Sequence, residues 1–414
     1  MRIGIDLRCL EEEKISGVGE YALEIVRNLL EIDSQNKYVV FSNSYRQRSQ
    51  HFNFLEKYQN VRLKRLHYPN KLLNFSLWYF GWPKLDKLIG PPRLSPRSDG
   101  AGGETGGANI FFAPNINFLA ISRNCPLVTT FHDLSFERFP EFFTRYARLW
   151  HFFFVNPRRI ARKSDRVIAV SQSTTHDLNE IYSINPPKPK VVHHGIGGDF
   201  KIIDRNDPTL LRVQKKYDLP YKFILYLGNI EPRKNISSLI ESFKKFQKSN
   251  PDLEKYKLVL AGNISPLCQN IIKKEKENIQ VIGYIDREDK PFVYNLASLF
   301  VYPSLFEGFG LPILEAMACG TPVIASNNSS IPEVAGDAAI LIDPNRPQEI
   351  FESAQSVLKD EKLYGKLREK GLLQAKKFSW KKCAKETLNV ILSEAKEPVT
   401  RRQNGIDSSL HSSQ

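Results

Sequence analysis

The stretch Leu299–Ser326, "LFVYPSLFEGFGLPILEAMACGTPVIAS", predicts a strand, a helix and a second strand. "LFVYPS" and "TPVIAS" are short apolar runs typical of strands buried on both faces, and Pro312 favours a helix that begins near Leu311. Glu307 then falls in the loop before the helix, and Glu315 lies one turn into it. Burying a carboxylate is costly unless it is paired. We therefore expect both glutamates to serve a site at the carboxyl end of a parallel strand; the alternative is an ordinary amphipathic helix with Glu315 in water.

The same alternation of strand and helix extends along the rest of the chain. Further strand-like runs are "RIGIDLR", "KYVVFS", "VRLKRL", "NIFFAP", "PLVTTF", "RVIAVS", "KVVHH", "KFILYLG", "KLVLAG", "IQVIGY" and "AAILID". Near-continuous apolar strands between helices predict parallel sheets covered on both faces. A polar, proline-bearing stretch around Ile203–Pro220 separates two such units. The predicted fold is therefore α/β, with two Rossmann-like, doubly wound domains that face a cleft.

These boundaries give a predicted domain organisation. We expect a first domain over 1–200, a second domain over 201–378, a helix over 379–396 that packs back on the first domain, and a disordered tail over 397–414. Residues Pro91–Asn109 are rich in Gly, Pro and Ser, which predicts a mobile loop within the first domain.

Bulk composition restricts the class of protein. A chain of 414 residues is longer than the chains that fold around a single hydrophobic core. It has no apolar run of the roughly 18 residues that are needed to span a bilayer. The first residues form a strand-like run rather than a signal peptide. Its 5 cysteines are scattered without CxxC spacing, which argues against a disulfide framework and a zinc site. We expect a cytoplasmic protein.

The net charge of +14 indicates an anionic partner. Nucleic acid, anionic lipid and phosphorylated small molecules all fit such an excess. No zinc-finger, RNP-type or helix-turn-helix pattern is present, so we expect no nucleic-acid partner. A basic nucleic-acid-binding protein is the alternative from another class, and a steep salt dependence of DNA affinity would support it.

Cations follow another predicted strand in "YLGNIEPRKNISSLIESF". The strand ends at Leu227, Gly228 makes a tight turn, and a helix begins near Asn235. Arg233 and Lys234 thus lie on a strand-to-helix loop, where a fork-shaped donor beside an ammonium suits a diphosphate. A solvated basic turn is the alternative.

Two first-domain motifs also follow strands. Gly17 and Gly19 open a helix in "SGVGEYA", but the motif lies eight residues beyond its strand and the second strand lacks the acidic residue of an NAD site. The interpretation that remains is an anion-binding site at this helix N-terminus, where glycine permits close approach of a ligand. His132 follows the strand of "LVTTFHDLSF" at a position typical of a ligand site. The sequence has no DxD motif and no His or Cys pair with metal-ligand spacing, so we expect no metal.

Two aromatic stretches carry basic neighbours. "NKLLNFSLWYFGWPKLDKL" spans Asn70–Leu88, and "RYARLWHFFFVNPRRIARK" spans Arg145–Lys163. This composition is typical of interfacial membrane contacts that do not span the bilayer. We expect peripheral contact with an anionic membrane, at the inner face of the cell membrane; the alternative is that the aromatic residues are core.

Together these motifs resemble the retaining glycosyltransferases of family 4, which have the GT-B fold. The resemblance runs from Met1 to about Ala395, and its most specific part is the spacing of Glu307 and Glu315. "GNIEPRKN", "SGVGEYALEIVRNL" and "FHDLSFERFPEFF" add to it, the last being similar to a mannosyltransferase-like branch. One departure is "HHGIGGDF", which has His194 and Gly197 where relatives usually show Asn and Asp.

The resemblance implies roles for these residues. Glu315 holds the ribose hydroxyls of a nucleotide sugar, and Glu307 contacts the donor sugar. Arg233 and Lys234 stabilise the leaving diphosphate, and His132 lies against the donor sugar. The remaining donor-binding residues are Gly17, Gly19, Gly228, Phe309, Gly310 and Leu311.

The resemblance also implies an activity. It is the transfer of a hexose, with mannose as the expected sugar, from GDP-mannose or a UDP-hexose to a glycan or lipid-linked acceptor, with retention of configuration and no cofactor. The first domain would then lie on the acceptor side, and the second domain would bind the nucleotide sugar. The enzymatic alternatives are a GT-B sugar-nucleotide epimerase and a glycan phosphorylase. A phosphorylase of the pyridoxal-phosphate type would show the absorbance of its cofactor.

Overall fold

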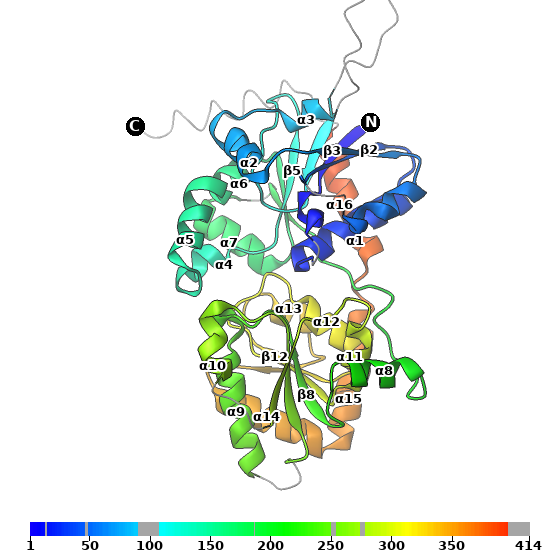
Figure 1. Ribbon diagram of the computed structural model, residues 1–414, viewed down its shortest axis with the longest axis vertical. Coiled ribbons are helices and arrows are strands. Elements are labelled where there is room, and N and C mark those ends of the chain that lie inside the picture. Colours follow the sequence, from blue (N-terminus) through cyan, green and yellow to red (C-terminus); the bar gives the residue numbers. More distant parts are fainter. Residues whose placement is uncertain are drawn as a thin grey trace, which may run out of the picture.

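The computed structural model describes residues 1–12, 15–45, 49–89, 107–185, 187–249, 254–273 and 278–395. Within them lie a seven-stranded sheet and a six-stranded sheet, each the centre of one unit of the molecule (Figure 1). The predicted fold class, two doubly wound parallel-sheet units, is confirmed. Most of the predicted loop Pro91–Asn109 and all of the predicted tail 397–414 lie outside the described residues.

The first unit is built on a parallel sheet with the order β3-β2-β1-β4-β5-β6-β7. Its strands are β1 (Arg2–Asp6), β2 (Lys37–Asn43), β3 (Val61–Leu66), β4 (Ile110–Ala113), β5 (Leu127–Phe131), β6 (Arg166–Ala169) and β7 (Pro189–Val191). Every strand pair is parallel, from Ile3 opposite Tyr38 to Ala169 opposite Val191. The strands formed where strand-like runs predicted them. β1, β2, β4, β5 and β6 are buried along most of their length, as expected of strands covered on both faces, whereas β3 has exposed residues.

Helices cover both faces of this sheet. They are α1 (Gly17–Ile32), α2 (Asn70–Tyr79), α3 (Leu85–Leu88), α4 (Ser135–Arg138), α5 (Arg145–Leu149), α6 (Pro157–Lys163) and α7 (Gln172–Tyr182). Short helical turns are η1 (Arg8–Glu11), η2 (Gln50–Lys57), η3 (Pro140–Phe142) and the π-helical turn η4 (Trp150–Val155). One core contains α1, and a separate core on the other face contains α2 and α3.

The second unit is built on a sheet with the order β10-β9-β8-β11-β12-β13. Its strands are β8 (Phe223–Leu227), β9 (Lys257–Ala261), β10 (Ile279–Gly283), β11 (Leu299–Tyr302), β12 (Val323–Ser326) and β13 (Ile340–Ile342). Its helices are α8 (Pro208–Lys216), α9 (Ile236–Ser249), α10 (Gln269–Lys273), α11 (Lys290–Leu296), α12 (Leu311–Ala318), α13 (Ile331–Ala335), α14 (Pro347–Lys359) and α15 (Glu361–Ala375), with short turns η5 (Pro232–Lys234) and η7 (Pro266–Cys268).

The polar stretch Ile203–Pro220 is more ordered than its composition predicts. It contains α8, which Asp207 caps by accepting a hydrogen bond from the Thr209 amide at 2.8 Å. Only Leu210 and Val213 of this helix are buried, so its apolar pattern is too short to stand out in the sequence.

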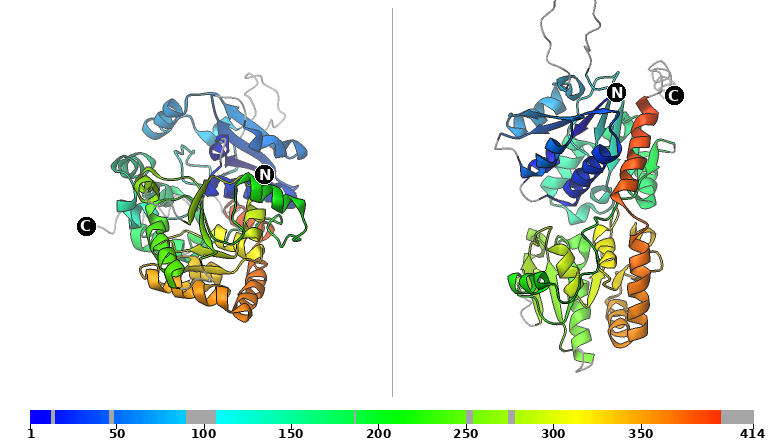
Figure 2. Two further views of the ribbon diagram at one scale, coloured as in Figure 1. Left: turned by 60° about the horizontal axis from the view of Figure 1, so that its bottom comes forward. Right: turned by 90° about the vertical axis from the view of Figure 1, so that its right-hand side faces the viewer.

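The chain crosses between the units twice. After β7 it passes into the second unit, and after α15 it returns as α16 (Trp380–Ala395), which lies beside the first sheet (Figure 2). The two crossings touch where Ile196 forms an isolated parallel bridge with Ser379. Buried residues of α16, including Trp380, Cys383 and Ile391, belong to the same core as α1. Among the described helices, each is too short or too polar to cross a bilayer.

Candidate functional site

The predicted site residues of the second unit follow two neighbouring strands. β8 and β11 pair at the point where the strand order of the sheet reverses, which is where open α/β sheets bind ligands. Arg233 and Lys234 lie in η5, after β8, and Glu307 lies in the loop after β11. Gly228 ends β8 with a φ of 153°. The sequence placed these residues on separate loops, and the sheet order makes the loops adjacent.

Glu307 is buried and held by both cations. Lys234 Nζ donates to Glu307 Oε1 at 2.5 Å, and Arg233 Nη1 lies 3.4 Å from Glu307 Oε2. Burial alone would raise the pKa of Glu307, but Lys234 and Arg233 lower it below its ordinary value. Lys234 also donates to the Tyr302 hydroxyl at 2.8 Å. Glu307 therefore stays ionised, as part of a compact group of two cations and one anion.

The loop that carries Glu307 is fixed by hydrogen bonds. Ser330 Oγ donates toward the carbonyls of Glu307 and Phe309, at 3.0 and 2.9 Å. Gly310 has a φ of 108°, a conformation that favours glycine, and it precedes the first turn of α12. The first amides of a helix have no intrahelical partner, so Leu311 starts a helix whose positive end faces this loop. Phe309 itself is buried.

Glu315 lies on α12 with a different set of partners. The Tyr294 hydroxyl donates to Glu315 Oε2 at 2.7 Å, and Lys290 Nζ lies 3.6 Å from Glu315 Oε1. Burial raises the pKa of Glu315, and Lys290 opposes this shift. The sequence interpretation missed Tyr294 and Lys290. Both lie on α11, and Lys290 could have been found because it follows the strand-like run "IQVIGY".

The first unit brings His132 to the same region. His132 Nε2 makes a 2.9 Å hydrogen bond with the Pro114 carbonyl, and burial lowers the pKa of this imidazole, so it is neutral. Gly17 and Gly19 begin α1, where the Ser16 side chain accepts from the Gly19 amide at 3.4 Å. Among the residues that the structure describes, none lies within 4 Å of a Cβ placed at Gly17.

The two units meet at the loop of Glu307. A Cβ built on Gly308 would lie 1.8 Å from the His132 carbonyl oxygen, so only glycine permits this approach. Across the same contact, Arg233 Nη1 lies 3.9 Å from Asp133 Oδ2. The structure therefore brings His132, Arg233, Lys234 and Glu307 together from both units.

His194 lies between the units in an aromatic environment. Its ring stacks on Tyr21 with centroids 4.7 Å apart and lies 4.7 Å from Phe309 and 5.5 Å from His132. Neither ring nitrogen of this buried histidine has a hydrogen-bond partner among the described residues. Burial, with His132 and His193 nearby, lowers the pKa of His194 well below its ordinary value. His194 stands where relatives usually show Asn, and it thus places a neutral imidazole beside the loop of Phe309.

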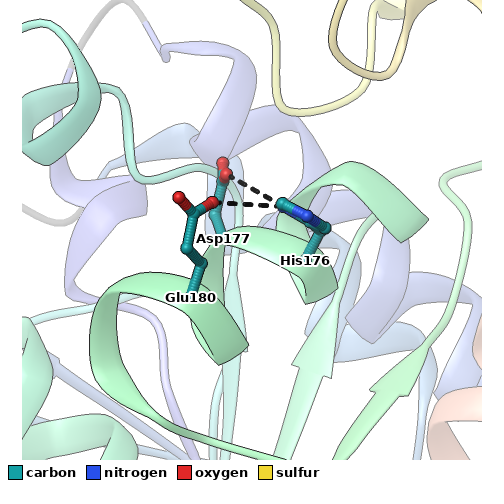
Figure 3. A group of neighbouring side chains, drawn as sticks. All are labelled: His176, Asp177 and Glu180. Atoms are coloured by element: carbon teal, nitrogen blue, oxygen red, sulfur yellow. Dashed lines mark ion pairs between the residues drawn. The ribbon is translucent and has the colours of Figure 1, made fainter.

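The described residues contain one group with the side chains of a metal site, and it lies on α7 (Figure 3). It consists of His176, Asp177 and Glu180. Arg138 donates to both carboxylates of this group, at 2.7 Å to Asp177 and at a shorter distance to Glu180. Because the Arg138 guanidinium already binds both carboxylates, the group is better explained as an ion-pair cluster than as a cation site.

Comparison with known proteins identifies the family. Residues 106–198 match the family model described as Glycosyltransferase Family 4, and residues 209–374 match the model Glycosyl transferases group 1. The chain is 31% identical over 386 residues to the O-antigen chain mannosyltransferase B of Escherichia coli, covering 91% of this chain and 95% of that protein. This chain belongs to glycosyltransferase family 4.

Other similar proteins agree with this assignment. The family 4 chain is 35% identical over 235 residues to the serotype-specific mannosyltransferase WbdA of Escherichia coli, covering 55% of this chain and 29% of that protein. Anabaena Alr3699/HepE, solved in complex with UDP and glucose, superposes with a TM-score of 0.68 at 16% identity, covering 95% of this chain and 100% of that chain. WaaG, a glycosyltransferase involved in lipopolysaccharide biosynthesis, gives a TM-score of 0.64 at 14% identity over 94% and 99% of the two chains. At these identities the solved structures support the fold alone.

Proposed function

We propose that this family 4 enzyme transfers mannose from a nucleotide sugar to a glycan or lipid-linked acceptor, with retention of configuration, in cell-surface polysaccharide synthesis. The observation that carries the proposal is the group of Arg233, Lys234 and Glu307 at the reversal of the strand order, beside the start of α12. The relative that spans most of the chain is named an O-antigen chain mannosyltransferase, which supports the sugar and the product class.

The proposed site separates donor binding from leaving-group stabilisation. Glu315 accepts hydrogen bonds from the ribose, and the amides of Phe309, Gly310 and Leu311 bind the diphosphate at the helix N-terminus. Arg233 and Lys234 stabilise the negative charge that grows on the diphosphate as the glycosidic bond breaks. Preorganised charge of this kind commonly supplies the largest part of catalysis. His132 and Glu307 contact the donor sugar.

We propose no metal and no covalent nucleophile in this reaction. Two cations and a helix N-terminus suffice to neutralise a diphosphate, and the departing phosphate can itself assist attack on the same face of the sugar.

Arg233→Ala and Lys234→Ala should each lower kcat more than they raise KM, because charge on the leaving group increases toward the transition state. Transfer should persist in EDTA. Complete loss with the chelator, restored by Mn²⁺ or Mg²⁺, would contradict this mechanism.

The donor can be identified by binding. Named mannosyltransferases among the relatives favour GDP-mannose, whereas the HepE complex with UDP-glucose keeps UDP-hexoses in consideration. A thermal-shift screen should compare GDP, UDP and their hexose conjugates, because a ligand at 100 times its Kd stabilises a protein by about 2.7 kcal/mol. The stabilising sugar nucleotide is then incubated with lipid-linked oligosaccharide, and the anomeric configuration of the product is determined. Stabilisation by neither nucleotide would contradict the proposal.

We further propose that the first unit contacts an anionic membrane through an aromatic surface formed by α2 and the α5–η4 segment. The two segments pack together: Trp78 Nε1 donates to the Phe153 carbonyl at 3.3 Å, and the Trp78 and Phe154 rings lie 5.0 Å apart. Large apolar side chains are nevertheless exposed on this surface, namely Leu72, Phe75, Tyr79, Phe80, Trp82, Tyr146, Leu149, Phe153 and Phe154. A cluster of this size on a protein surface supports an interaction with an apolar phase.

Basic side chains surround this aromatic surface. Exposed Arg145 and Arg148 lie on α5, and exposed Arg158, Arg159 and Arg162 lie on α6, directly after η4. Trp78 and Trp150 are half-buried and hold the surface together. Tyr79, Phe80, Trp82, Phe153 and Phe154 are exposed, so the alternative that the aromatic residues are core does not apply to these five rings. Exposed aromatic residues bordered by cations fit the headgroup region of an anionic bilayer.

A further inference from the structure

Charged residues of the two units meet beside Glu315. Arg287, in the loop after β10, donates to Glu24 of α1 at 2.5 Å and lies 3.4 Å from Glu20. Lys290, the first residue of α11, donates to Glu20 at 3.3 Å. Both carboxylates belong to the first unit and both cations to the second, so these ion pairs exist only while the units are in contact.

Lys290 is shared between the two units. Its Nζ lies 3.3 Å from Glu20 Oε2 and 3.6 Å from Glu315 Oε1. The other oxygen of Glu315 accepts from the Tyr294 hydroxyl, so α11 contacts the carboxylate through both of its oxygens. One ammonium group thus joins the proposed ribose-binding carboxylate to the opposite unit.

The surroundings of Lys290 make these interactions stronger than surface ion pairs. The side chains are only 17% exposed for Lys290, 13% for Glu20 and 4% for Glu315. Burial alone would lower the pKa of Lys290, but Glu315 and Glu20 raise it above its ordinary value, so the ammonium stays charged. Charges that are partly removed from water are screened less by salt, and loss of one partner leaves the others uncompensated.

We propose that Lys290 is a positioning residue, which Glu20 of the first unit holds against Glu315, so that contact between the units and a competent donor site support each other. The inference rests on the proposed role of Glu315 in donor binding. Lys290 acts through Glu315 and needs no contact with the donor. Because coupling between two equilibria is reciprocal, donor binding also favours the contact of the two units.

A double-mutant cycle on nucleotide binding tests the proposal. The Kd of GDP and of UDP is measured by calorimetry for the wild type, Glu20→Gln, Lys290→Met and the double variant. Glu20→Gln should weaken binding about fivefold and Lys290→Met at least as much, in line with typical coupling between sites. The double variant should be no weaker than Lys290→Met, and Lys290→Arg should restore most of the affinity. Multiplicative effects of the two single variants would overturn the proposal.

A second measurement needs no nucleotide. The radius of gyration from solution X-ray scattering should rise in the Glu20→Gln/Glu24→Gln variant relative to the wild type at the same low salt concentration. Glu241→Gln, which removes an exposed pair with Lys245 within α9, is the control and should behave as the wild type. An unchanged radius of gyration in the Glu20→Gln/Glu24→Gln variant would overturn the proposed contact. A wild type that binds neither nucleotide would instead overturn the proposed function, whatever the scattering shows.

Discussion

Glu307 and Glu315 lie eight residues apart but experience different charges. Glu307 faces the cations Arg233 and Lys234, whereas Glu315 faces Lys290 and a tyrosine hydroxyl. A carboxylate between two cations fixes their position relative to a substrate, while the Glu315 carboxylate, with one hydroxyl donor and an ammonium 3.6 Å away, keeps lone pairs that can accept a further hydrogen bond. The two glutamates should therefore affect different steps.

Glu315→Ala is expected mainly to raise the KM for the donor. Loss of a hydrogen bond to a charged group costs about 1.5–3 kcal/mol, which is roughly tenfold to a hundredfold in affinity. Glu307→Gln should lower kcat more than donor affinity. Steady-state kinetics of both variants, with the exposed Glu361→Gln as control, would measure this difference. Wild-type kinetics in both would mean that neither carboxylate serves the site.

His194 should make the fold sensitive to acid. Burial holds its native pKa well below 6.5, so the native state excludes a proton that the unfolded chain binds. The unfolding free energy should thus be constant above about pH 6.5 and fall below it, by at most about 1.4 kcal/mol per pH unit from this residue. Urea melts between pH 5 and 7.5 should show a shallower acid slope for His194→Asn, with surface His67→Asn as control. An identical slope in His194→Asn would contradict this assignment.

At the residue scale, sequence position alone located most of the proposed site. Arg233, Lys234, Glu307 and His132 each follow a predicted strand, and the carboxyl ends of parallel strands share one edge. The contact that Lys290 makes with Glu20 was not predictable in the same way. Lys290 contacts Glu20 only because the two units come together, and no local sequence pattern predicts a contact between residues of different units.

At the scale of elements, the loop between β11 and α12 also forms part of the contact between the units. Thr174 Oγ1 on α7 donates toward the carbonyls of His132 and Gly308, at 3.3 and 3.5 Å. Val170 packs with Phe309, Leu314, Phe378 and Val334 of α13 in one small core shared by both units. The position of Glu307 and the closeness of the units are therefore set by the same few residues.

Gly308→Ala should lower activity without lowering the stability of either unit. The added methyl would lie 1.8 Å from the His132 carbonyl, so the loop or the whole unit must move. We expect kcat to fall at least tenfold, since displacement of about 1 Å at a reacting centre can cost a hundredfold. Gly198→Ala is the control, because no residue in the described part of the chain lies within 4 Å of a Cβ built there. Unchanged kcat in Gly308→Ala would show that the two units do not approach this closely during catalysis.

The elements themselves were largely predictable. Buried parallel strands have a simple apolar pattern, and all the strand-like runs became strands. The helix α8 was missed because it buries only two side chains and its other residues are polar. The strand order was not predicted from the runs, because pairing depends on contacts between distant segments.

At the scale of the whole molecule, the aromatic surface of the first unit predicts reversible binding to anionic vesicles. Flotation at low salt should recover the wild type, and binding should fall as salt rises, because each basic group near the leaflet contributes about 1 kcal/mol. Reversing Arg158, Arg159 and Arg162 to Glu should reduce flotation strongly. The matched control reverses three exposed lysines of the second unit: Lys362, Lys366 and Lys376.

The outcome distinguishes two acceptor classes. Loss of flotation in the arginine variant alone would support a lipid-linked acceptor reached at the membrane. Equal flotation of both variants, or none for the wild type, would contradict membrane contact and favour a soluble acceptor. Circular dichroism of each variant establishes that the fold is retained.

The return of α16 to the first core has a consequence for how the chain acquires its structure during translation. Trp380, Cys383 and Ile391 complete a core whose other members, such as Ile3 and Tyr21, are made at the start of synthesis. The second unit has all its strands and helices once residue 375 has left the ribosome. Part of the apolar surface of the first unit therefore stays uncovered until α16 is made, after the elements of the second unit, whereas a domain made first usually completes its core first.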